Sequence, residues 1–204
     1  MNRSLKTRIA AREQLVGTFV KTPSAIVCEV LGRTELDLVC LDAEHAPFDR
    51  LVQDQCLYAL RNEGMASLVR LPSAASEHIL NALDCGATGV VIPHVTSPQM
   101  AERVARAVHF GAGGRGYAGS TRAAGYTTKP MAAHLADSAA QSVVVAQIED
   151  VDALGSIDEI ASVEGIDCLF VGRIDLTVAL GASSPADPQV VSAVERICRA
   201  GADA

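Results

Sequence analysis

The stretch LDLVCLDAEHAPFD, residues 36–49, shows the pattern that decides the fold. Its apolar run over 36–41 reads as a buried strand, and Asp42, Glu44 and His45 follow at once. Burying a charge is costly unless the charge is paired or used, so packing alone does not explain three ionisable side chains at one strand end. In α/β proteins the carboxyl ends of strands carry the chemistry. This stretch therefore predicts an α/β fold with a functional site after the strand.

Similar apolar runs alternate with helical patterns along the chain. The expected helices open on the capping residues Thr22, Asp49, Ser97 and Asp187, three of which precede a proline. Repeated strand–helix units are typical of a parallel sheet. No linker or change of composition divides the chain, which predicts a single domain over residues 1–204. The expected strands are 16–21, 36–42, 66–71, 89–95, 142–149 and 167–173.

Such a sheet can be open or closed. A doubly wound sheet usually has a glycine-rich turn after its first strand, where this chain has Lys21-Thr22-Pro23. A TIM barrel has eight strand–helix units, of which six are recognisable here. We expect a (β/α)8 TIM barrel that is C-terminally incomplete in this chain, with strands seven and eight missing. Its open edges would favour aggregation, so we expect them to be buried in a homo-oligomer.

The composition excludes several classes of protein. The net charge of −7 comes without a lysine or arginine cluster that could follow phosphates, which argues against nucleic-acid binding. The polar N-terminus has no secretion signal, and no apolar run approaches the ~20 residues of a membrane span. Six scattered cysteines without a CxxC pair indicate reduced thiols. We expect a cytoplasmic protein that binds no membrane.

The polar residues at the expected strand ends suggest a specific chemistry. Glu149 and Asp175 are hard oxygen donors that suit Mg²⁺, Mn²⁺ or Co²⁺. Arg70 offers a planar fork for a substrate carboxylate. His45 suits a general base, with Asp42 three residues upstream to orient it. Metal ion, carboxylate clamp and base together predict enolate chemistry on a 2-oxo acid.

Each of these residues also has a plainer interpretation. Arg70 could form a surface ion pair, Glu149 could cap a following helix, and Asp175 alone reads best as an N-cap. His94, after a strand, could line the site or be merely structural. Lys21 is the lysine that ends a strand, but a solvated charge at the rim fits it better than a Schiff base, so a metal-free lysine aldolase is disfavoured.

Six motifs resemble the HpcH/HpaI aldolase family. They are LDAEHAPFD (41–49), VRLP (69–72), IPHV (92–95), GGRGYAG (113–119), AQIED (146–150) and FVGRIDLT (170–177). The family comprises class II, divalent-metal-dependent pyruvate aldolases on a TIM barrel of the pyruvate/phosphoenolpyruvate-utilising type. The resemblance implies reversible aldol cleavage of a 4-hydroxy-2-oxo (2-keto-3-deoxy) acid to pyruvate and an aldehyde, through a metal-stabilised enolate. It also implies a role in aromatic or sugar-acid catabolism and a trimer or hexamer.

The resemblance also assigns roles to individual residues. It implies Glu149 and Asp175 as metal ligands, Arg70 at the pyruvyl carboxylate, His45 with Asp42 as the acid/base pair, Gln147, Gly172 and Ile174 in substrate binding, and Asp84 in a neighbouring subunit's site.

This chain departs from the family in two respects. The family usually has Gly-Pro-Ala-Asp where residues 172–175 read Gly-Arg-Ile-Asp, and its members extend further at the C-terminal end. Two other functions therefore stay open. One is a citrate-lyase- or citrate-synthase-like C–C lyase acting on oxaloacetate or a CoA thioester, for which no nucleotide or pantetheine site is apparent. The other is an inactive, truncated barrel that serves as an assembly subunit.

Overall fold

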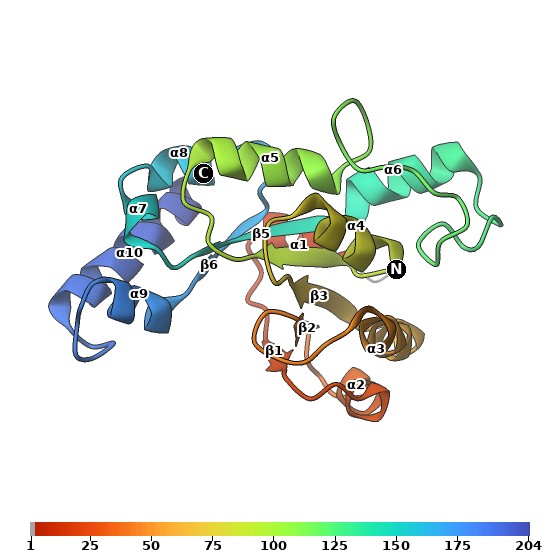
Figure 1. Ribbon diagram of the computed structural model, residues 1–204, viewed down its shortest axis with the longest axis horizontal. Coiled ribbons are helices and arrows are strands. Elements are labelled where there is room, and N and C mark those ends of the chain that lie inside the picture. Colours follow the sequence, from red (N-terminus) through yellow and green to blue (C-terminus); the bar gives the residue numbers. More distant parts are fainter. Residues whose placement is uncertain (1–2) are drawn as a thin grey trace.

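Six parallel strands lie side by side in chain order in the computed structural model, which describes residues 3–204. The strands are β1 (Gly17–Val20), β2 (Leu38–Asp42), β3 (Ala66–Arg70), β4 (Gly89–Ile92), β5 (Val143–Ile148) and β6 (Cys168–Val171). Every expected strand is present, shorter by one or more residues than predicted. Because the order never reverses, the sheet is a half-barrel of the TIM type and not a doubly wound sheet (Figure 1). That strands seven and eight of a complete barrel are missing from this chain stays a prediction.

Apart from the first helix, which precedes β1 and packs inside the half-barrel, the helices follow the strands, and most of them pack on the outer side of the sheet (Figure 1). They are α1 (Leu5–Ala10), α2 (Ala25–Gly32), α3 (Arg50–Asn62), α4 (Ser76–Asp84), α5 (Pro98–Val108), α6 (Met131–Gln141), α7 (Val151–Leu154), α8 (Ile157–Ala161), α9 (Arg173–Ala179) and α10 (Pro188–Asp203). None of these helices is long and apolar enough to cross a membrane. Asp49, Ser97 and Asp187 cap helices as predicted. Thr22 does not, because α2 begins two residues later on the Ser24 hydroxyl.

Successive side chains of a strand point to opposite faces of the sheet, and they form two separate apolar clusters. Val39 and Leu41 of β2 face outward and join the large core between sheet and helices. Cys40 faces inward and joins a smaller cluster inside the half-barrel, which also contains Phe170 of β6. Leu5 of α1 packs into this inner cluster.

The same alternation decides which polar side chains enter the half-barrel. Asp42 is two residues after Cys40 and therefore also faces inward. The register of the sheet places Asp42 beside Arg70 of the neighbouring strand. Lys21 follows two residues after Phe19, which is in register with Cys40. Sequence alternation thus gathers polar groups at one end of the concave face.

Two aromatic contacts connect the edges of the sheet with this polar end. The Phe19 ring of β1 lies 5.5 Å from the Phe170 ring of β6, measured between centroids. The Arg70 guanidinium lies over the same Phe19 ring, 4.9 Å from its centroid. Phe19 therefore contacts both the opposite edge strand and a predicted site residue.

Candidate active site

A buried ion pair joins the ends of β2 and β3. Arg70 Nε donates to Asp42 Oδ1 at 3.0 Å, and Arg70 Nη2 donates to Asp42 Oδ2 at 2.7 Å. Asp42 is completely buried, and the Arg70 side chain is 10% exposed. Burial by itself would raise the pKa of Asp42, but the hydrogen bonds from Arg70 and from the His45 backbone hold that pKa below its usual value. Asp42 is therefore a buried, paired carboxylate.

His45 and Glu44 follow in the turn after β2. The sequence predicted that Asp42 orients the His45 ring, but Asp42 Oδ1 accepts the His45 backbone N–H at 3.0 Å instead. The reason is local: at the end of a strand the carboxylate closes the turn three residues onward. The His45 ring points elsewhere, with Nε2 3.7 Å from Glu44 Oε2, and the side chain is 53% exposed. The His45 imidazole is therefore exposed beyond the carboxyl end of β2.

Glu44 was present in the decisive motif but received no role from the sequence. Its Oε2 lies 3.3 Å from Arg70 Nε, and its side chain is 10% exposed. Burial, aided by the nearby negative charge of Glu149, raises the pKa of Glu44, although Arg70 opposes the shift. Glu44 therefore extends the polar network from β2 towards β5.

Glu149 is the most deeply placed carboxylate at the end of β5, with a side chain only 2% exposed. Its Oε1 accepts the backbone N–H of His94 at 2.8 Å, and its Oε2 accepts Nε2 of Gln147 at 2.5 Å. Within residues 3–204 no lysine or arginine nitrogen lies within 4.0 Å of this carboxylate. Glu149 is thus held in position by neutral donors, and its negative charge has no permanent cation beside it.

His94 interacts with Glu149 through its ring as well as its backbone. Nδ1 lies 3.4 Å from Glu149 Oε1 and 2.9 Å from Asp150 Oδ2, while Nε2 lies 3.8 Å from Glu44 Oε1. The hydrogen bond with Asp150 is the largest influence on His94 and raises its pKa. His94 has a positive φ of 55°, which is uncommon for a residue other than glycine. The structure therefore favours the interpretation of His94 as part of the site.

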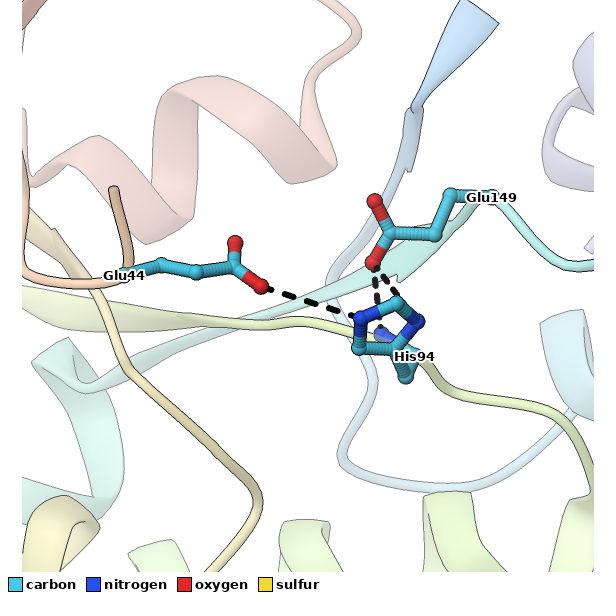
Figure 2. A group of neighbouring side chains, drawn as sticks. All are labelled: Glu44, His94 and Glu149. Carbon is cyan, nitrogen blue, oxygen red and sulfur yellow. Dashed lines mark hydrogen bonds and ion pairs between the residues drawn. The ribbon is translucent and has the colours of Figure 1, made fainter. Parts of the chain in front are cut away.

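Glu44, His94 and Glu149 could together hold a metal ion (Figure 2). One ligand atom from each lies within 4.8 Å of the others, and the set offers two carboxylates and one imidazole. The sequence had paired Glu149 with Asp175 instead. Asp175 is exposed in the first turn of α9, and Gly172, not Asp175, is the N-cap of that helix. Glu149 is common to the predicted pair and the observed group.

Gly172 brings the start of α9 against Glu149. A Cβ atom on Gly172 would lie 2.5 Å from the Glu149 Cβ, so glycine permits this close approach. Gly172 N–H donates to Ile148 O at 2.9 Å, which fixes the turn. Ile174, two residues later, is exposed. The first turn of α9, which contains Asp175, therefore begins beside the Glu149 side chain.

Two other predicted residues lie in different surroundings. Gln147 is completely buried and, besides its bond to Glu149, has an Oε1 atom without a hydrogen-bond partner in the described chain. Asp84 ends α4, where its backbone carbonyl accepts the Ala123 N–H at 3.3 Å. Burial raises the pKa of Asp84. Its predicted role in a neighbouring subunit stays a prediction.

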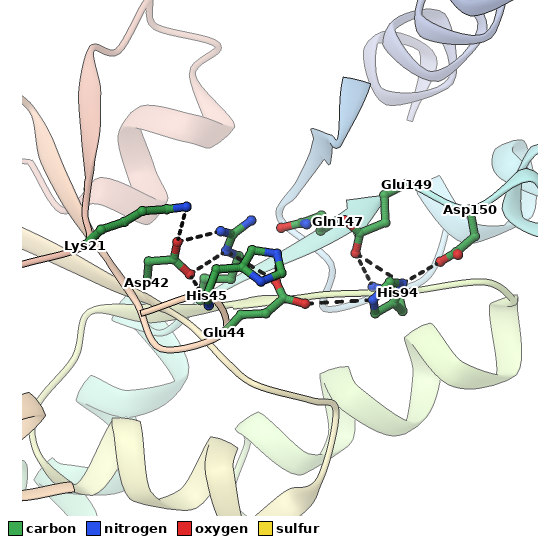
Figure 3. A network of polar contacts seen from close by, with 9 residues as sticks. Lys21, Asp42, Glu44, His45, His94, Gln147, Glu149 and Asp150 are labelled. Atoms are coloured by element: carbon green, nitrogen blue, oxygen red, sulfur yellow. Dashed lines mark hydrogen bonds and ion pairs between the residues drawn. The ribbon is translucent and has the colours of Figure 1, made fainter. Parts of the chain in front are cut away.

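The polar side chains form a row across the carboxyl ends of the strands, from β1 to β5 (Figure 3). Figure 3 shows Lys21 at one end and Asp150 at the other, with Asp42, Glu44 and His94 between them. Lys21 and Arg70 lie on the β1–β3 side, whereas on the β5 side Glu149 has His94 beside it but no lysine or arginine partner among residues 3–204. Such an arrangement can bind an anionic substrate at one side and a cation at the other.

Comparisons with known proteins give a consistent result. A family model described as HpcH/HpaI aldolase/citrate lyase matches residues 15–204. The chain is 35% identical to a 4-hydroxy-2-oxovalerate aldolase from Rhodococcus jostii (strain RHA1), with 97% of this chain and 78% of the relative covered. It is 34% identical to a 5-keto-4-deoxy-D-glucarate aldolase from Shigella boydii serotype 18 (strain CDC 3083-94 / BS512), covering 94% and 75%. A crystal structure of an HpcH/HpaI aldolase/citrate lyase family protein from Burkholderia cenocepacia J2315 superposes with a TM-score of 0.92 at 31% identity, covering 98% and 80%.

Proposed function

Because the chain belongs to the HpcH/HpaI aldolase/citrate lyase family, we propose that it is a class II aldolase. Its reaction would be the reversible cleavage of a 4-hydroxy-2-oxo acid to pyruvate and an aldehyde. One observation carries the proposal: the Glu149 carboxylate is buried at a strand end, beside Glu44 and His94, without a lysine or arginine partner in the described residues. A buried charge of this kind needs a counter-ion, and a divalent cation provides one.

The residues present fit such a cation. Carboxylate oxygens with one imidazole suit Mg²⁺, Mn²⁺ or Co²⁺, and the nearby start of α9 offers Asp175 as a further oxygen donor. We propose Glu149 as the central ligand, with Asp175 as its partner and Glu44 or His94 beside them. When bound, the ion supplies positive charge opposite the negative charge that develops on the keto oxygen.

Arg70 would hold the substrate carboxylate. Asp42 occupies the Nε and Nη2 edge of the guanidinium, and Nη1 forms no hydrogen bond to any residue between 3 and 204. The pairing with Asp42 fixes the plane of the guanidinium and leaves Nη1 to bind the substrate carboxylate. Gln147 and the backbone near Gly172 would complete the binding of the 2-oxo acid.

His45 would act as the base. In the cleavage direction its imidazole removes the proton of the C4 hydroxyl, the C3–C4 bond breaks, and the aldehyde leaves. The bonding electrons pass to the enolate of pyruvate, which then takes a proton at C3 and becomes pyruvate. Asp42 holds the backbone of the turn that carries His45, so it is a positioning residue for the base.

Exchange of the pyruvate methyl protons in D₂O tests the proposal without knowledge of the aldehyde. We expect exchange with Mn²⁺ or Mg²⁺ that stops with EDTA, and Glu149→Gln should lose it while keeping its fold by circular dichroism. Lys129→Met is the control, because Lys129 pairs with Asp137 away from the carboxyl ends of the strands. Metal-independent exchange, or full exchange by Glu149→Gln, would contradict the proposal. Exchange that requires a CoA ester would favour the citrate-lyase-like alternative.

The ligand set has its own test. Asp175→Asn and His94→Asn should be compared with Glu149→Gln by titration with Mn²⁺, followed by electron paramagnetic resonance. The proposal expects Asp175→Asn to weaken binding at least tenfold and His94→Asn to weaken it less. The reverse order would identify Glu44, His94 and Glu149 as the ligands instead.

A further inference from the structure

The loop between α5 and α6, which the proposed function does not use, carries a buried arginine. Gly114 allows this loop to turn tightly, because a Cβ atom there would collide with the carbonyl oxygen of His109. The backbone N–H of Arg115 donates to that same oxygen at 2.8 Å. The Arg115 guanidinium lies over the Phe110 ring, 4.0 Å from its centroid. This stacking fixes the plane of the guanidinium inside the protein.

The charge of Arg115 has no ion-pair partner. The residue is 7% exposed, and within residues 3–204 no carboxylate oxygen lies within 4.0 Å of its guanidinium nitrogens. Nη2 donates to Ser138 Oγ at 3.1 Å, whereas Nε is buried without a hydrogen-bond partner in the described chain. Burial lowers the pKa of Arg115, and the negative charge of Asp84 opposes only part of this shift. A buried cation that is incompletely paired is unfavourable unless a ligand completes it.

A second buried nitrogen without a partner lies nearby, on α6. His134 is 3% exposed, and its Nε2 has no hydrogen-bond partner among the described residues. Its ring centroid is 5.3 Å from that of Phe110, so Arg115 and His134 pack against the same aromatic side chain. Both line one cavity of about 440 Å³, together with Ser138 and Ser142, whose hydroxyl oxygens are 3.3 Å apart. Two orphaned nitrogens and two hydroxyl groups therefore border the same space.

The rest of the cavity wall adds positive charge. The cavity lies at the amino ends of β3, β4 and β5, at the opposite end of the strands from the candidate active site. Lys129 in its wall is neutralised by Asp137 at 2.7 Å, and Arg3 forms an ion pair with Glu13. Arg61, which is exposed, also lines the cavity and has no carboxylate within 4.0 Å in the part of the chain that the structure describes. Two unpaired positive charges therefore border this space.

We propose that this cavity binds a phosphate group. Its two unpaired cations, Arg61 and Arg115, match the dianion that a phosphate monoester approaches near neutral pH, and the guanidinium fork and the hydroxyl groups match its oxygens. Burial, aided by Arg115 and Lys129, lowers the pKa of His134, so its neutral imidazole adds one N–H donor. Free phosphate and a small phosphomonoester share this chemistry, and the volume has room for the larger of the two.

Histidine ring signals in ¹H–¹⁵N NMR spectra of the full chain test the proposal. EDTA is present throughout, because metal ions would bind phosphate at the carboxyl ends of the strands. Glycerol 3-phosphate should shift the His134 signal, identified with His134→Gln, until it saturates. The signals of His45 and His94 should stay unchanged. Shifts of these two signals without a shift of His134 would place the anion at the candidate active site and overturn the proposal.

Charge variants test which side chains hold the anion. Arg115→Met should weaken the binding of glycerol 3-phosphate by about tenfold or more, the loss expected for a charge-assisted hydrogen bond, and Arg61→Met should weaken it less. Arg103→Met is the matched control, because it removes the same charge from an exposed position of α5 outside the cavity. Should Arg115→Met fail to fold by circular dichroism, Arg115→Lys keeps the charge without the fork and should still bind more weakly. Unchanged affinity in the folded Arg115 variant would overturn the proposal.

Four small molecules in the same titration identify the ligand. Glycerol should not bind, and succinate, a dianion without phosphorus, should bind more weakly than glycerol 3-phosphate. Succinate binding that is equally tight would overturn the assignment to phosphate, and the absence of a saturable His134 shift would overturn the site itself. Tighter binding of glycerol 3-phosphate than of inorganic phosphate would identify a phosphomonoester as the ligand. The reverse order would identify free phosphate.

Discussion

Replacing Asp42 with asparagine should destabilise the protein, because the buried Arg70 guanidinium would lose its counter-ion. Asparagine keeps the shape of the side chain and can still accept the His45 backbone N–H, but the Arg70 guanidinium loses its buried counter-ion. Removing one partner of a buried ion pair costs about 3–5 kcal/mol. Glu44 remains 3.3 Å from Arg70 Nε and compensates part of the loss, so we expect the lower end, about 3 kcal/mol.

Thermal and urea unfolding of the metal-free protein measure this effect. For a chain of this size ~3 kcal/mol corresponds to a decrease in Tm of roughly 6–12 °C. The double variant Asp42→Asn/Arg70→Met should recover part of the loss, because it removes both charges and leaves neither one unpaired. Unchanged midpoints in Asp42→Asn, or additive losses in the double variant, would refute the reasoning.

The ion pair between Asp42 and Arg70 should also make the free energy of unfolding depend on pH. The folded-state pKa of Asp42 is lowered, so its stabilising contribution is complete above the unfolded-state value near ~3.9 and is lost as the pH falls through the lower folded value. The difference in free energy of unfolding between the unmodified chain and Asp42→Asn should therefore be constant near neutrality and shrink below pH ~4. A difference that grows on acidification would contradict this sign.

Two glycine substitutions give further predictions. Gly89→Ala would bring a Cβ within 2.7 Å of the Val143 Cβ and against the Val143 carbonyl, so we expect a loss of about 2 kcal/mol or more in urea unfolding. Gly116→Ala, which meets nothing within 4 Å, is the control and should be nearly neutral. Gly172→Ala would press on Glu149 at 2.5 Å and should weaken Mn²⁺ binding about tenfold in titrations, with a smaller effect on stability. Unaltered Mn²⁺ affinity in that variant would argue against Glu149 as a ligand.

The sequence predicted the fold well because apolar runs and caps are local signals. All six strands were expected from such runs, and three of four helix caps are correct. Thr22 failed because Ser24 offers an equally good hydroxyl two residues later, and local patterns do not choose between them. The strands are shorter than predicted because apolar residues such as Leu36, Leu71 and Val95 continue the apolar pattern outside the sheet ladder.

The site was predictable as a list of residues but not as a set of contacts. Strand-end position alone identified Asp42, Arg70 and Glu149. The pairing of Arg70 with Asp42 depends on the register of two strands, which no local pattern reveals. His94 enters the site through a left-handed backbone conformation after Pro93, and no sequence signal predicted that turn. Its position after a strand was the one hint available.

Through Phe19, the separation of the two edge strands is linked to the position of the Arg70 guanidinium. One face of that ring supports the Arg70 guanidinium, and the same ring contacts Phe170 on the far edge strand. A partner or segment that increases the distance between β1 and β6 would move the Phe19 ring away from the Arg70 guanidinium. If Arg70 holds the substrate carboxylate as proposed, a partner bound at the edge strands would change the affinity for the 2-oxo acid without contacting the site.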